Sequence, residues 1–229
     1  MQNDTNQYFS ILGDSVSTLS GYNPPECAVF YDWEQKYLSG VYTPQDTWWG
    51  RVLEALGGRL LVNHSYAGST VTRHPSCRIP SYGCSDERTG ALALGDQQPD
   101  VVMVLMGLND FGCRMPVDGE GELSVFSVAY ETMLRKIRAN YPRAEVWCLT
   151  LPVGTGLLDP IFLLSTAAPV AEYCRAIRVC AEKTGCRLVD IYDPEHPYET
   201  VDGYHPTANG MAAIAEAVLR SLAQGGAQI

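Results

Sequence analysis

The sequence predicts an α/β protein, built as a parallel β-sheet with helices on both of its faces. Short apolar runs alternate with segments of helical periodicity along the 229 residues, which is typical of repeated βαβ units. The clearest run, residues 101–106, is continuously apolar, as a central strand buried on both faces should be. A chain of this length can bury one large core, so we expect a single domain over residues 1–229.

Each expected element has its own sequence signal. Apolar runs bounded by turn residues predict strands, and apolar residues spaced three or four apart predict helices. Gly57, Gly185 and Pro142 close three of these helices. The expected strands are residues 7–12, 59–63, 101–106, 145–149 and 187–191. The expected helices are residues 48–56, 86–94, 126–141, 170–184 and a last one from about Pro206 to Leu222.

Residues 17–45 form a long connection without a clean period, so no regular element is predicted there. Structureless segments of this length inside a compact domain are usually functional. The connection is rich in aromatic rings, which could either cover the edge of the sheet or contact a ligand. These aromatic residues are Tyr22, Phe30, Tyr31, Trp33, Tyr37 and Tyr42, and they lead to Trp48 and Trp49.

The charge balance excludes several classes of partner. A formal net charge of -10 argues against nucleic acid and against anionic membrane surfaces, both of which select basic proteins. No run approaches 18 apolar residues, so no transmembrane helix is expected. The first seven residues are polar and lack the basic-then-apolar pattern of a secretory signal. We therefore expect a cytoplasmic protein that acts on an uncharged small molecule.

Eight cysteines are spread over the whole chain, which is too dilute for a disulfide framework. No CxxC pair and no Cys/His pair has the spacing of zinc ligands, so we expect no metal. Cys77 and Cys84 could form a disulfide, but only in an oxidising compartment.

Four polar clusters follow expected strands or precede the last helix. Because the carboxyl ends of parallel strands meet at one edge of the sheet, where open α/β sheets bind ligands, we expect a functional site there. Packing alone does not account for polar residues gathered at this edge from separate segments. The clusters are marked by Ser15, by Gly68, by Asn109, and by Asp202 with His205.

The last cluster has the sequence context of a base with an orienting carboxylate. Pro206 pushes His205 out of helical conformation and is well placed as the first residue of the last helix. Asp202 can fold back on the imidazole, fix its tautomer and stabilise its protonated form. The other ring nitrogen can then take a proton from Ser15, whose hydroxyl is a poor nucleophile without such help. In isolation, a histidine before proline is more often a structural surface residue.

Gly68 and Asn109 fit the remaining requirement of acyl transfer, which is a set of donors for the developing oxyanion. A glycine lets a backbone N–H approach closely, and an asparagine amide is a neutral donor. With the N–H of Ser15, these residues make three donors. Each residue also has an ordinary interpretation as a turn or a helix cap, so the prediction depends on their occurring together and in this order.

The ordered set resembles the motifs of the SGNH (GDSL-type) hydrolases. The first motif is similar to Gly13-Asp14-Ser15-Val16, where Val16 stands in place of the usual leucine. Gly68 best matches the glycine of the second motif. The third motif is similar to Gly107-Leu108-Asn109-Asp110, and the last to Asp202-Gly203-Tyr204-His205. The resemblance extends from residue 13 to residue 205.

This resemblance implies a flavodoxin-like three-layer α/β/α sandwich with a five-stranded parallel sheet of order 2-1-3-4-5. It also implies ester hydrolysis through an acyl-enzyme without a cofactor. The Gly-x-Ser-x-Gly elbow of the α/β-hydrolases is absent. The implied catalytic residues are Ser15, Asp202 and His205, and the implied oxyanion hole is formed by Ser15, Gly68 and Asn109.

The expected substrate is a small-molecule ester, and an acetylated carbohydrate is favoured because the aromatic connection could stack on sugar rings. Alternatives are a lysophospholipase- or thioesterase-type lipid ester hydrolase and a catalytically inactive carbohydrate-binding domain. A flavodoxin-like FMN or phosphate binder is a further alternative. It would wrap a phosphate with the hydroxyl groups of Ser15, Ser17, Thr18 and Ser20, and it leaves Asn109, Asp202 and His205 unexplained.

Overall fold

A five-stranded parallel sheet of order β2-β1-β3-β4-β5 lies at the centre of the computed structural model, which describes residues 7–73, 81–158 and 168–225. This order confirms the predicted one. It places β1 between β2 and β3, so the segments that follow these three strands start side by side. The strands are β1 (Tyr8–Gly13), β2 (Arg59–Asn63), β3 (Val101–Leu105), β4 (Glu145–Leu149) and β5 (Arg187–Val189).

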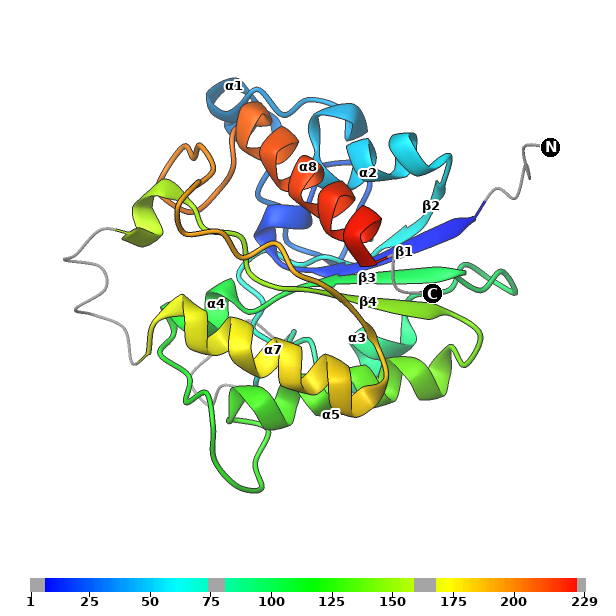
Figure 1. Cartoon of the computed structure of the whole chain (residues 1–229). Helices are drawn as coiled ribbons and strands as arrows, with labels where there is room; N and C mark the ends of the chain where they lie inside the picture. The colour runs from blue at the N-terminus through cyan, green and yellow to red at the C-terminus, as the bar shows by residue number, and fades with distance from the viewer. Residues whose placement is uncertain (1–6, 74–80, 159–167, 226–229) are drawn as a thin grey trace.

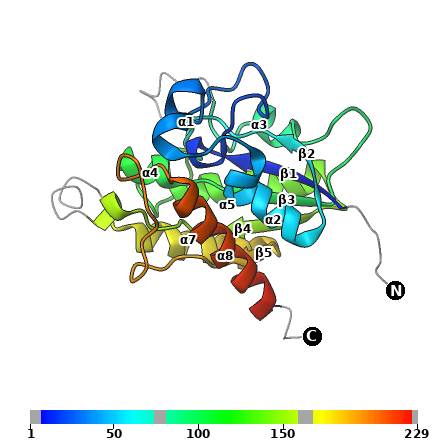
Figure 2. The same cartoon turned by 90° about the horizontal axis from the view of Figure 1, so that it is seen from above.

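Helices cover both faces of the sheet and complete three layers (Figure 1). On one face lie α2 (Trp48–Leu56) and α8 (Ala208–Gly225), and on the other α5 (Phe126–Asn140) and α7 (Val170–Thr184). Figure 2 shows α2 and α8 lying over the strands. The shorter helices are α1 (Trp33–Ser39), α3 (Asp86–Gly90) and α4 (Leu108–Gly112), with the 3₁₀ turns η1 (Ser15–Ser17), η2 (Pro44–Asp46) and η3 (Thr155–Leu158).

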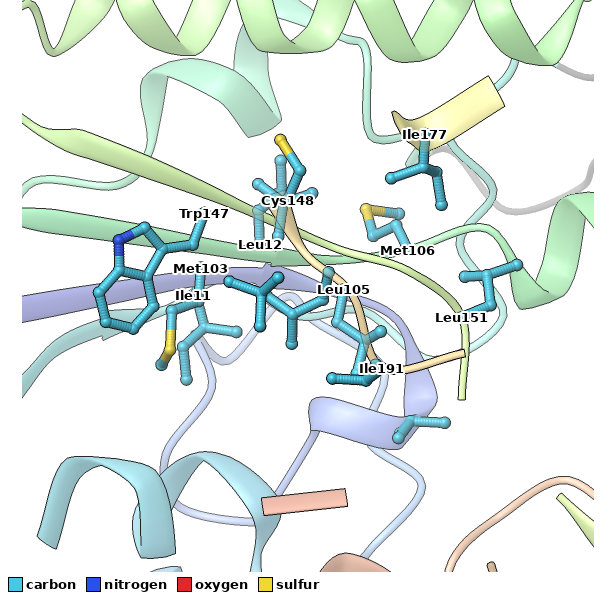
Figure 3. Packing of buried hydrophobic residues seen from close by; sticks show 14 of the residues in the cluster. Ile11, Leu12, Met103, Leu105, Met106, Trp147, Cys148, Leu151, Ile177 and Ile191 are labelled. Atoms are coloured by element: carbon cyan, nitrogen blue, oxygen red, sulfur yellow. The ribbon is translucent and has the colours of Figure 1, made fainter. Parts of the chain in front are cut away.

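The core between the layers is dense and apolar (Figure 3). Every residue of β3 is buried, as its continuous apolar run predicts. Ile11 and Leu12 of β1 lie beside Met103 of β3 and Cys148 of β4, and all four side chains are fully buried. Interiors packed in this way resist deformation, so the core fixes the positions at which the strands end.

The register brings three strand ends to one edge of the sheet. Gly13 of β1 pairs with Leu105 of β3, and Ile11 of β1 pairs with Asn63 of β2. Beyond β2 the pairing continues, because Tyr66 donates its backbone N–H to the Gly13 carbonyl at 3.1 Å. The residues that follow β1, β2 and β3 therefore begin within reach of one another.

The connection after β1 contains regular structure that its sequence did not reveal. α1 begins after Asp32, whose side chain accepts hydrogen bonds from Glu34 N and Gln35 N, and it ends at Gly40 with φ +72°. Only Ser39 of this helix is buried. Because α1 packs no apolar stripe against the core, periodicity could not predict it.

Several expected boundaries shift. The last helix begins at Ala208 rather than Pro206, because Thr207 caps it by accepting a hydrogen bond from Gly210 N at 3.2 Å. β1 begins and ends one residue later than expected, β3 ends one residue earlier and β5 two residues earlier, and α3 stops at Gly90. Cys77 lies outside the described residues, so its pairing with Cys84 stays a prediction.

Within residues 7–73, 81–158 and 168–225, no helix has both the length and the apolar character needed to cross a membrane. Across the same ranges, no group of three or more His, Cys, Asp or Glu side chains is arranged to hold a metal ion.

Candidate active site

Ser15 opens the tight turn η1 directly after β1. The side chain of Asp14 caps this turn by accepting a hydrogen bond from Val16 N at 3.1 Å. Residue 13 must be glycine, because a Cβ there would lie 2.6 Å from Ser65 Oγ and 2.7 Å from Ser17 Cβ. The turn thus places the Ser15 hydroxyl at the carboxyl edge of the sheet.

Two indole groups hold the same turn from α2. Trp48 Nε1 donates to Ser17 Oγ at 3.1 Å, and Trp49 Nε1 donates to the Ser17 carbonyl at 3.0 Å. The side chain of Asn63 donates to that carbonyl as well, at 2.8 Å. Both tryptophans are buried, so they act as anchors beneath Ser15 and cannot contact a ligand.

A continuous chain of hydrogen bonds links Ser15, His205 and Asp202. His205 Nε2 lies 2.9 Å from Ser15 Oγ, and His205 Nδ1 lies 2.6 Å from Asp202 Oδ2. The other oxygen of Asp202 accepts the backbone N–H groups of His205 and Tyr204 at 2.8 and 3.0 Å. This geometry can transfer the hydroxyl proton to the imidazole and stabilise the imidazolium that results.

Burial and hydrogen bonding set the protonation of the histidine and its carboxylate. Burial holds the pKa of His205 below 6.5, although the carboxylate of Asp202 acts in the opposite direction. Burial alone would raise the pKa of Asp202, but hydrogen bonds from His205 and Tyr204 outweigh it and keep that pKa below 3.8. At neutral pH the histidine is therefore a neutral base beside an ionised carboxylate.

Phe30 holds the imidazole from one side. Its ring stacks on that of His205 with centroids 3.5 Å apart and planes 10° apart. The backbone N–H of Phe30 donates to Thr18 Oγ1, which in turn donates to the Ser15 carbonyl. The next residue, Tyr31, donates its hydroxyl to the Pro206 carbonyl at 2.8 Å. Residues 30 and 31 thus join the serine turn to the histidine loop, which the sequence did not reveal because nothing in the pattern separates these rings from their neighbours.

Gly68 and Asn109 lie on adjoining loops. Gly68 has φ +79° in the turn closed by the hydrogen bond from Ser69 N to the Tyr66 carbonyl, and a type II turn requires a residue such as glycine there. Asn109, in the first turn of α4, donates its side-chain amide to the Ser69 carbonyl at 3.0 Å. The structure therefore joins the second and third clusters directly.

Asp110 reinforces that junction, although the sequence analysis gave it no role. It is fully buried, and it accepts hydrogen bonds from Val71 N at 2.8 Å, Thr72 N at 3.0 Å and Thr72 Oγ1 at 2.7 Å. Burial raises the pKa of Asp110 to about 6, against the effect of these hydrogen bonds. Its position beside Asn109 in the Gly-x-Asn-Asp pattern was the available signal.

A pocket of about 300 Å³ opens over these groups. Ser15 and His205 lie on its wall together with Asn109, whereas Gly68 is not among its lining residues. The remaining wall is partly apolar. The other lining residues are Val16, Leu108, Gly112, Cys113 and Tyr204.

Residues 11–213 match the family model of the GDSL-like lipase/acylhydrolase family. This match includes all five residues predicted for the site, namely Ser15, Gly68, Asn109, Asp202 and His205. No curated protein matches the sequence.

Solved structures share the fold. A protein of Bacteroides ovatus described as a GDSL-like lipase is 23% identical, with a TM-score of 0.72 over 95% of this chain and 98% of its own. A protein of Bacteroides uniformis described in the same way is 24% identical, with a TM-score of 0.71 over 96% of each chain. A carbohydrate esterase family 2 enzyme of Corynascus thermopiles, which carries a carbohydrate-binding domain, is 18% identical, with a TM-score of 0.61 over 96% of this chain and 67% of its own.

Proposed function

The chain belongs to the GDSL-like lipase/acylhydrolase family, and on that premise we propose that it hydrolyses carboxylic esters through an acyl-enzyme formed on Ser15. The hydrogen-bond chain from Ser15 through His205 to Asp202 carries this proposal. It supplies a hydroxyl, a neutral base and an orienting carboxylate in one line, which is what nucleophilic catalysis by serine requires.

In the acylation step, Ser15 Oγ attacks the ester carbonyl carbon while its proton passes to His205 Nε2. The carbonyl oxygen becomes an oxyanion, and collapse of the tetrahedral intermediate expels the alcohol, which takes the proton back from His205. A water molecule then repeats the sequence on the acyl-enzyme and releases the carboxylic acid and free Ser15. Asp202 stays ionised throughout and stabilises the imidazolium.

Three donors would hold the oxyanion, namely the backbone N–H groups of Ser15 and Gly68 and the side-chain amide of Asn109. A primary amide carries two N–H groups. One of them is given to the Ser69 carbonyl, which fixes the orientation of the side chain and leaves the second for the substrate. Donors oriented before the reaction stabilise the charge without having to reorganise.

Two substitutions test this scheme with p-nitrophenyl acetate as the substrate. Ser15→Ala should abolish hydrolysis while circular dichroism shows a folded protein, and Ser20→Ala, which removes a nearby exposed hydroxyl, should keep full activity. Asn109→Ala should lower kcat/KM by about 10²- to 10³-fold. Full activity in Ser15→Ala would refute the mechanism, and a loss below about threefold in Asn109→Ala would remove Asn109 from the oxyanion hole.

The hydroxyl groups after β1 argue against the phosphate-binding alternative. Ser17 Oγ accepts a hydrogen bond from Trp48 Nε1, and Thr18 Oγ1 is engaged with the Ser15 carbonyl and Phe30 N. Both side chains are fully buried. Only rearrangement of the turn would allow them to wrap a phosphate, so we retain the hydrolase.

We further propose that the ester is a short-chain one on a carbohydrate. Trp33, Tyr37 and Tyr42 form an exposed aromatic strip, with 74%, 65% and 49% of their surfaces accessible. The rings follow one another edge to face, at centroid distances of 5.6 and 6.3 Å. Large rings with polar tips that remain in water suit a sugar surface, which presents apolar C–H faces and hydroxyl groups together.

The location of the strip supports the same proposal. α1 starts three residues after Phe30, whose ring contacts His205. At the other end of α1, a Cβ on Gly40 would lie 3.6 Å from Ala208 Cβ, at the start of α8. The strip therefore belongs to the segment that borders the catalytic histidine. The similarity in fold to a carbohydrate esterase agrees with this substrate class.

A series of p-nitrophenyl esters from acetyl to octanoyl, with a panel of acetylated sugars, tests the substrate. We expect acetyl esters to react fastest, and Trp33→Ala to raise KM for an acetylated oligosaccharide while kcat/KM for p-nitrophenyl acetate stays unchanged. Faster turnover of octanoyl esters would favour the lipid-type alternative. An unchanged KM in Trp33→Ala would exclude the strip from substrate binding.

A further inference from the structure

Arg88, on the short helix α3, is a buried cation behind the candidate active site. Only 1% of its surface is accessible. Arginine is rarely buried without an acidic partner, yet none of the described carboxylates accepts a hydrogen bond from this guanidinium. Burial lowers the pKa of Arg88 to about 10, so the side chain remains charged at neutral pH.

Neutral acceptors satisfy all five N–H groups of the guanidinium. Nε donates to His64 Nδ1 at 2.9 Å. Nη1 donates to the hydroxyl oxygens of Ser69 and Ser81, both at 2.8 Å. Nη2 donates to the carbonyl oxygens of Gly13 at 3.0 Å and His64 at 2.6 Å. The guanidinium therefore joins four separate places in the chain through one rigid plane.

Two of these acceptors, on Gly13 and Ser69, lie within two residues of predicted oxyanion donors. Gly13 is two residues before Ser15, and its carbonyl also receives the N–H of Tyr66, where the Gly68 turn begins. Ser69 directly follows Gly68, and its carbonyl orients the Asn109 amide. Tyr66 lies against the guanidinium as well, with its ring centroid 6.0 Å from Arg88 Cζ.

Moving a charged group out of water costs free energy, and hydrogen bonds to neutral acceptors offset less of that free energy than a carboxylate would. An apolar side chain would fill this part of the core at a lower cost in free energy. The arrangement is therefore better explained by what the guanidinium holds in place.

We propose that Arg88 is a positioning residue for the oxyanion hole, because its five hydrogen bonds fix the Ser15 turn, the Gly68 turn and, through the Ser69 carbonyl, the amide of Asn109 relative to one another. This inference rests on the proposed function. It assigns Arg88 no contact with substrate. It predicts that Arg88 acts on the same part of the reaction as Asn109 and independently of the His205 loop.

A double-mutant cycle tests that coupling with p-nitrophenyl acetate. Lysine keeps the charge of Arg88 but offers three donors from one atom in place of a planar set of five. Arg88→Lys should therefore lower kcat/KM by about 10²-fold. In the double variant with Asn109→Ala, the combined loss should fall well short of the product of the two single losses, because both changes weaken the same oxyanion hole. The proposal would be overturned if the two single losses in kcat/KM multiply in the double variant, or if Arg88→Lys lowers kcat/KM by less than about threefold.

Two serines provide a matched pair if Arg88→Lys does not fold. Ser69 and Ser81 are both buried, and their hydroxyl groups accept from the same Nη1 at the same distance. Only Ser69 lies beside oxyanion donors. Ser69→Ala should lower kcat/KM about tenfold, whereas Ser81→Ala should change it by less than twofold at a similar thermal stability. Equal effects on kcat/KM would show a merely structural network.

The Ser15→Ala variant separates this inference from the proposed function. If Ser15→Ala retains activity, the mechanism itself fails. If Ser15→Ala is inactive while Arg88→Lys and Ser69→Ala keep normal kcat/KM, the mechanism stands and only the role of Arg88 is refuted.

Discussion

Replacing Asp14 by asparagine should stabilise the folded protein above neutral pH and change its stability little in acid. Asp14 is 1% exposed and directly precedes Ser15. Its Oδ1 caps η1, whereas its Oδ2 is buried and has no hydrogen-bond partner among the described residues. An asparagine can keep the cap through its own Oδ1, and it removes the ionisation.

The magnitude follows from the protonation of this carboxyl. Burial raises the pKa of Asp14 from 3.8 to about 7, although the hydrogen bond from Val16 N opposes that change. Between these values the unfolded chain is ionised while the folded protein holds the proton, so stability falls as the pH rises. The difference between these two pKa values lowers the free energy of unfolding by about 4 kcal/mol. This loss of stability is absent below pH 3.8 and complete above pH 7.

Urea denaturation at pH 4 and pH 8 measures the effect as a difference between the variant and the parent protein. The free energy of unfolding of Asp14→Asn, minus that of the parent, should be about 4 kcal/mol larger at pH 8 than at pH 4. Burial also raises the pKa of Asp110 to about 6, and the charge of Asp110 is one of the causes that raise the pKa of Asp14, so the measured difference includes the interaction between these two carboxyl groups.

Asp32 offers a matched control, because its side chain also caps a helix but lies exposed at the start of α1. Asp32→Asn, measured at the same two pH values, gives the effect of exchanging a capping carboxylate for an amide at an exposed site. If the difference for Asp14→Asn stays constant within about 1 kcal/mol between the two pH values, then Asp14 has nearly the same pKa in the folded and the unfolded protein, and the reasoning from its burial is wrong.

Three further substitutions or titrations address the site. The acid limb of kcat/KM for a neutral ester should have its midpoint below pH 6.5, since activity needs neutral His205 and burial lowers its pKa; a midpoint above pH 7.5 would contradict this. Phe30→Ala should lower kcat/KM about tenfold by freeing the imidazole, and Phe30→Tyr, which keeps a stacking ring, should retain most activity. Gly13→Ala should lower the free energy of unfolding, measured by urea denaturation, by about 1–3 kcal/mol, because the added Cβ would lie 2.6 Å from Ser65 Oγ. An unchanged free energy of unfolding would show that the turn can relax.

The strands of the sheet could be predicted because a strand that is buried on both faces is apolar along its whole length. All residues of β3 are buried, and an unbroken apolar run is the necessary result. α1 left no such trace, since its packing buries only Ser39. The start of α8 was misplaced by two residues because proline and threonine both suit a helix N-terminus, and the hydrogen bond from Gly210 N to Thr207 depends on the folded backbone.

The gathering of Ser15, Asn109 and His205 around one pocket was predictable because each follows a strand or precedes a helix, and topology brings those ends together. Their supports were not predictable. The stacking of Phe30 on His205 joins residues far apart in sequence. Nothing in the sequence distinguishes Phe30 from the other aromatic residues of the same connection, so this contact could not be predicted. Arg88 resembled any other basic residue in a polar stretch, because only the fold decides that its five donors meet neutral acceptors.

The contact between Ser15 and His205 joins residues 190 positions apart. Contacts of such long range form late in folding, because the loop between them must close first. During synthesis, Ser15 leaves the ribosome long before His205 and the start of α8 are available to it. On the proposed mechanism, the hydroxyl of a nascent chain therefore has no base to activate it until α8 packs against α2 and His205 reaches Ser15.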